Sequence, residues 1–134
     1  MPVTWSVRDG VLIVAAVGDY PSSELTGALQ SAMQDPQLGP RTPVLLDARS
    51  SVTYLSPDEI HRRIAWLGSL HHDGLFPFIA FVAAADRYRA RIVGLGVAAL
   101  RQLGIEVKVF TEWDAGFAWL REASKPPPSP IRDG

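Results

Sequence analysis

Residues 11–17, Val-Leu-Ile-Val-Ala-Ala-Val, form an unbroken run of seven apolar residues. The run has the length of one strand, and a strand without polar positions is expected to be covered on both faces, as in a parallel sheet. Asp9-Gly10, just before it, is a strong signal for a two-residue hairpin turn. Because residues 3–8 alternate apolar and polar side chains, the N-terminal part of the chain predicts a β-hairpin whose second strand is central.

Helical and strand-like patterns alternate after the hairpin. Apolar residues at helical spacing predict helices at residues 20–35, 56–70, 86–103 and 113–120. Short apolar or alternating runs predict strands at residues 44–46, 76–84 and 106–110. The order β-β-α-β-α-β-α-β-α predicts an α/β fold with a mixed, mostly parallel five-stranded sheet and four helices. We expect residues 1–123 to form a single domain and the proline-rich residues 124–134 to form a disordered tail.

The composition is that of an ordinary globular domain and excludes several functions. The chain has 134 residues and a formal net charge of −1, without the basic excess expected of a nucleic-acid-binding protein. The absence of cysteine rules out disulfides, thiolate nucleophiles and zinc–thiolate sites. We expect a cytoplasmic protein without a membrane span, because neither a signal peptide nor an apolar stretch of about 18 residues is present.

Two stretches of sequence, together with the element order, resemble the STAS family of anti-sigma-factor antagonist domains over residues 3–123. The first is Val-Leu-Leu-Asp-Ala-Arg at 44–49, followed by Val-Thr-Tyr-Leu at 52–55 and a capped helix. The second is Val-Lys-Val-Phe at 107–110, with the Trp-Asp-Ala and Ala-Trp-Leu segments after it. This ending looks like the SpoIIAA-like or STAS/SEC14-like branch of small bacterial proteins. The resemblance implies a non-enzymatic regulatory domain.

The start of the second predicted helix departs from the phosphoswitch members of that family. They carry an Asp-Ser-Ser-Gly type of motif, whose serine is phosphorylated, where this chain has Ser56-Pro57-Asp58-Glu59. The acceptor serine falls at Asp58, which a serine kinase cannot modify. A carboxylate at the first helical turn also has a purely structural interpretation, because it stabilises the helix dipole. Ser56 is the remaining candidate acceptor, and it is also the expected helix cap.

Catalytic and metal-binding patterns are missing. Asp47, at the end of a predicted strand, resembles the aspartate of a response-regulator receiver. The additional acids and the lysine of that site are not at the expected places, so we expect Asp47 to cap or to pair with Arg49. His71-His72-Asp73 could suggest a metal site, but no third ligand lies at a spacing typical of one. No Gly-x-Ser-x-Gly or phosphate-binding glycine loop is present. We therefore predict no catalytic residue, no metal and no cofactor.

The third predicted helix, residues 86–103, is the strongest candidate surface. Its apolar arc is wider than a surface helix needs, and Gly94 and Gly96 lower its helix propensity, which suggests a close neighbour there. The start of this helix carries cations where the dipole disfavours them, which suggests an anionic ligand. The candidate interaction residues are Arg87, Tyr88, Arg89, Arg91, Val93, Val97 and Leu100.

Two hypotheses from different classes follow. The first is an interaction domain that forms a homodimer through the third helix or binds another protein there. The alternative is a domain for a small apolar or anionic ligand or a lipid, with a pocket lined by aromatic residues. The aromatic residues considered for that pocket are Trp66, Phe76, Phe78, Phe81 and Tyr88.

Overall fold

The computed structural model describes residues 3–18, 22–39, 41–51, 57–72, 77–84 and 87–123. The strands are β1 (Val3–Arg8), β2 (Val11–Gly18), β3 (Val44–Ser51), β4 (Phe78–Val82) and β5 (Glu106–Phe110). The helices are α1 (Ser22–Ala32), α2 (Pro57–His72), α3 (Arg87–Gln102) and α4 (Trp113–Ala123). The order of the elements and the α/β class predicted from the sequence are confirmed.

The strands form one mixed sheet in the order β1-β2-β3-β4-β5. β1 runs antiparallel to β2, and every other neighbouring pair is parallel. The predicted hairpin turn is confirmed: Asp9 and Gly10 have φ of 50° and 78°, the positive values that a type I′ turn needs at both central residues. A helix lies in each connection between parallel strands, since such connections must cross the length of the sheet.

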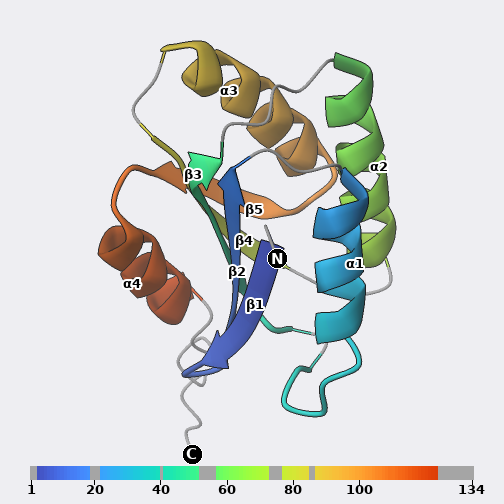
Figure 1. Ribbon diagram of the computed structural model, residues 1–134, viewed down its shortest axis with the longest axis vertical. Helices are drawn as coiled ribbons and strands as arrows, with labels where there is room; N and C mark the ends of the chain where they lie inside the picture. The colour runs from blue at the N-terminus through green and yellow to red at the C-terminus, as the bar shows by residue number, and fades with distance from the viewer. Residues whose placement is uncertain are drawn as a thin grey trace, which may run out of the picture.

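Helices α1, α2 and α3 lie on one side of the sheet and α4 lies on the other (Figure 1). We call the two sides the three-helix face and the α4 face. On the three-helix face, α1 packs on β1 and β2, α3 packs on β5, and α2 packs on α3. The buried core of this face includes Leu12, Val14, Leu25, Leu29, Leu100 and Val107. The core of the α4 face consists of Val11, Leu45, Ala80, Val82 and Leu120.

Gly116 allows α4 to lie close to the sheet. A Cβ atom at Gly116 would lie 3.2 Å from Cγ2 of Val82 and 3.3 Å from Cδ2 of Phe110, which is tighter than ordinary van der Waals contact. Trp119, on the same helix, packs against Phe110 with ring centroids 5.9 Å apart. The contact between α4 and the β4–β5 half of the sheet is therefore tight and rich in aromatic groups.

The opposite half of the α4 face is only partly covered. Thr4, Ser6 and Arg8 of β1 are exposed, and Val17, near the end of β2, is 57% exposed. A helix about 10 Å wide covers roughly two strand spacings of about 4.8 Å, so one helix cannot cover a sheet of five strands. The expectation that β2 is covered along both faces is therefore wrong at Val17.

Candidate interaction surfaces

The first turn of α2 presents negative charge to the surface. Asp58 is exposed, and Glu59 forms an ion pair with Arg62, with Oε1 and Nη1 3.4 Å apart. Both carboxylates also favour the helix by their position at its positive end. Ser56 lies outside the described residues. Asp58 is therefore accessible to a partner at the position where the resemblance implies a phosphoserine.

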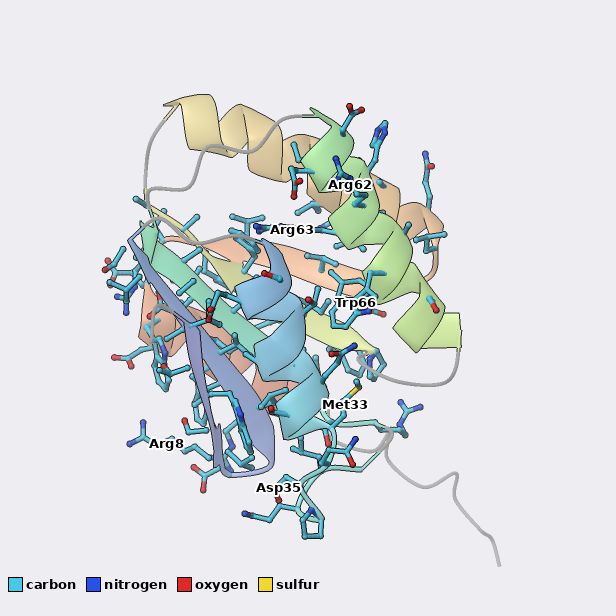
Figure 2. The ribbon with its side chains drawn as sticks, turned by 45° about the vertical axis from the view of Figure 1, so that its right-hand side comes forward. Arg8, Met33, Asp35, Arg62, Arg63 and Trp66 are labelled. Atoms are coloured by element: carbon cyan, nitrogen blue, oxygen red, sulfur yellow. The ribbon has the colours of Figure 1, made fainter. Side chains whose placement is uncertain are left out.

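The inner side of α2 is occupied by packing within the chain. Arg63 points from α2 toward the sheet (Figure 2), and its Nη2 atom is buried. Trp66, almost one turn later, points toward the end of α1 near Met33, and both side chains pack against the core of the three-helix face. Among the described residues of α2, a partner can therefore reach the outer side, where Asp58 and Arg62 are exposed.

The structure changes the candidate surface on α3. Leu100 is only 8% exposed and belongs to the core of the three-helix face, so its side chain is not available to a partner at the surface. Val97 packs against the same core and is half-buried. The wide apolar arc of α3 is thus partly explained by packing on β5 and α2. Five candidate side chains fall outside the described residues: Arg87, Tyr88, Arg89, Arg91 and Val93.

A close contact between helices occurs at Gly68 of α2, which the sequence pattern did not indicate. Among the described residues, nothing would lie within 4 Å of a Cβ atom at Gly94 or Gly96, so this part of the chain does not supply the close neighbour that was expected there. A Cβ atom at Gly68 of α2 would lie 2.6 Å from Cδ1 of Leu103. Gly68 therefore permits the approach of α2 to the end of α3, whereas Gly94 and Gly96 lie next to open space.

The outer edge of β5 is capped by a side chain of α3. The amides and carbonyls of Glu106 and Phe110 face β4, as the bonds from Glu106 N to Pro77 O (3.1 Å) and from Ala83 N to Phe110 O (2.9 Å) show. By the alternation along a strand, the carbonyl of Val107 faces outward. Arg101 donates to this oxygen from Nε (3.1 Å) and Nη2 (2.8 Å). The guanidinium thus occupies the edge of the sheet.

Asp47 and Arg49 form a two-point ion pair within β3, which confirms the predicted pairing. The strand continues to Ser51, so the prediction that it ends before Asp47 is wrong. Arg49 donates from Nε to Oδ1 (2.9 Å) and from Nη2 to Oδ2 (2.8 Å). The hydrogen bond from Arg49 lowers the pKa of Asp47 below its usual value, and partial burial opposes this shift. The hydrogen bond to Asp47 likewise raises the pKa of Arg49. The pair is a salt bridge between two charged groups, which favours a structural role over proton transfer.

Replacement of this carboxylate should make stability depend less on pH. Because the pKa of Asp47 is lower in the folded chain, its contribution is complete above the unfolded value of about 4 and is lost as the pH falls through the folded value. We expect Asp47→Asn to cost about 1 kcal/mol at neutral pH and progressively less below about pH 4. Urea unfolding of both proteins across this range measures the difference. A difference that stayed constant in acid would contradict the assignment.

Two of the five aromatic residues considered for a ligand pocket, Trp66 and Phe78, lie on different faces of the sheet. Trp66 packs on the three-helix face, whereas Phe78 packs on the α4 face and contacts the edge of Trp119. The sheet lies between them, so no single pocket is lined by both. A separate aromatic pair on the α4 face, Trp113 and Phe117, stacks with centroids 5.0 Å apart.

No metal site is found in the parts of the chain that the structure describes. His61 is exposed on α2, and the side chains of His71 and His72 are outside those parts, as is all of Asp73. Within the same described ranges, no helix has the length and hydropathy needed to cross a membrane.

Comparison with solved structures places this arrangement among known folds. The chain is similar to an uncharacterised Shewanella loihica protein of the DUF3478 family, which has a SpoIIAA-like fold. The match covers 88% of this chain and 91% of that protein, with a TM-score of 0.55 and 20% sequence identity. The chain has a SpoIIAA-like fold. An anti-sigma factor antagonist from Mycobacterium paratuberculosis matches over 89% of this chain and 92% of its own, with a TM-score of 0.58 and 16% identity. No protein-family model and no curated protein sequence matches the chain.

Proposed function

We propose that the protein is a non-enzymatic interaction domain that binds a protein partner without a phosphoserine switch. The observation that supports this proposal is the exposed Asp58 in the first turn of α2. A carboxylate at that place carries a permanent negative charge, whereas a serine carries one only when it is phosphorylated. The similarity in fold to an anti-sigma factor antagonist supports a protein as the partner.

Phosphorylation tests this proposal directly. The intact mass of the protein, isolated from the cells that produce it naturally, is expected to be that of the unmodified chain. A phosphate on Ser56 would contradict the absence of a switch. Affinity capture tests the role of Asp58: Asp58→Asn is expected to lose the partner that the wild type retains. Glu106→Gln, which neutralises an exposed carboxylate on β5, is the matched control and is expected to retain it.

We further propose that two copies of the chain associate. The sequence favours α3 for this contact. Leu100 is in the core, but Val97 is an apolar residue of α3 whose side chain is partly exposed. Size-exclusion chromatography with light scattering is expected to show a dimer at high protein concentration. A monomer throughout the concentration range would contradict self-association.

A further inference from the structure

The two edges of the sheet are protected differently. At β5, Arg101 covers an outward carbonyl, and the exposed charges of Glu106 and Lys108 flank it. Charged side chains and covered backbone groups are devices that prevent the addition of another strand. The other edge strand is β1, whose residues 3–7, Val-Thr-Trp-Ser-Val, carry no charge. In the described part of the chain, β5 is therefore protected against strand addition in a way that β1 is not.

The register of the hairpin fixes which backbone groups of β1 point outward. Arg8 pairs with Val11 across the turn, and the pair that closes a two-residue turn is hydrogen-bonded. Hydrogen-bonded positions alternate along an antiparallel pair, so the amides and carbonyls of Val3, Trp5 and Val7 face away from β2. These groups form a row that suits an additional antiparallel strand.

We propose that this row pairs with β1 of a second copy, antiparallel and about a two-fold axis through Trp5. The proposal rests on the self-association proposed above and moves the contact from α3 to β1. With the axis at Trp5, Val3 lies opposite Val7 of the second copy, and Thr4 lies opposite Ser6. Valine pairs, hydroxyl pairs and a central aromatic pair are favourable neighbours across two strands. The strand is therefore complementary to itself, as a two-fold contact requires.

The surroundings of β1 fit a second copy. α1 packs on β1 from the three-helix face, so the two α1 helices would lie beside the joined strands. On the α4 face, Thr4 and Ser6 are exposed, and Figure 2 shows Arg8 projecting from the hairpin on the side away from α1. The area buried by pairing five residues per strand is smaller than the roughly 800 Å² per partner that a standard interface buries. We therefore expect an association that depends on protein concentration.

A charge test separates this contact from others. Thr4→Lys/Ser6→Lys places like charges opposite each other in the pairing and is expected to abolish the dimer in sedimentation velocity across a concentration series. Thr4→Glu/Ser6→Lys places opposite charges there and is expected to retain it. Both residues are exposed, so the fold should be unaffected. Circular dichroism and urea unfolding of each variant check this.

The outcomes distinguish the two proposals. A wild-type monomer at every concentration would overturn self-association and the β1 contact together. A dimer that survives Thr4→Lys/Ser6→Lys but dissociates with Val97→Glu would overturn the β1 contact and leave self-association through α3. Dissociation by Thr4→Lys/Ser6→Lys and by Thr4→Glu/Ser6→Lys alike would also overturn the proposed register, because the sign of the charges would then have no effect.

Discussion

Leu120→Ala should destabilise the fold by about 2–5 kcal/mol, the range measured when a buried leucine is cut back to alanine. Leu120 is fully buried, with 0% exposure, and joins α4 to Leu45 and Val82 of the sheet. α4 is the only described helix on that face, so other helices cannot fill the space that the side chain leaves. Urea unfolding followed by tryptophan fluorescence measures the change.

Leu103→Ala is the matched control for this prediction. Leu103 carries the same side chain but is 48% exposed at the end of α3, where it also contacts Gly68 of α2. We expect its replacement to cost about 1 kcal/mol, well below the loss from Leu120→Ala. Equal losses from the two substitutions would show that the packing of α4 on the sheet does not have the importance that the structure implies.

Gly116→Val should have the second large effect, with a loss of about 3 kcal/mol. A Cβ atom at this position already lies 3.2 Å from Val82 and 3.3 Å from Phe110, and valine adds two further methyl groups. Overpacking of a well-filled core typically costs 1–3 kcal/mol, and α4 has little freedom to move away because Leu120 anchors it on the same face. Thermal unfolding or urea unfolding detects a loss of this size.

Gly94→Val separates packing from helix propensity. Gly94 also lies inside a helix, but a Cβ atom there meets none of the described residues within 4 Å. Valine has a somewhat higher helix propensity than glycine, so we expect stability to stay within about 0.5 kcal/mol of the wild type or to rise slightly. A loss as large as that of Gly116→Val would mean that both effects arise from the helix backbone and not from contact with the sheet.

The sequence was sufficient for the fold because each element carries a local signal. The Asp9-Gly10 turn is an example, and so is Gly104, whose φ of 93° ends α3 while Ile105 N bonds back to Leu100 O at 3.2 Å. These features depend on residues close together in the chain. Hydrophobic periodicity likewise depends on neighbours in sequence, and it located every helix and strand in the correct order.

The candidate surfaces were harder to predict because they depend on contacts distant in sequence. Periodicity shows that α3 is apolar over a wide arc, but it cannot show that Leu100 faces the core while Gly94 faces open space. The sequence could not indicate that Arg101 covers the edge of β5, because its acceptor is the carbonyl of Val107, a backbone group that every residue carries. By contrast, the pair of Asp47 and Arg49 was predictable, since two residues apart on a strand place both side chains on one face.

Native mass spectrometry of gently purified protein tests the central claim most directly. The proposed interaction domain predicts a dimer, in equilibrium with the monomer, without a bound small molecule. A monomer that carries a bound small mass, and shows no dimer as the concentration rises, would contradict the claim and would instead support a domain that binds a small apolar or anionic ligand.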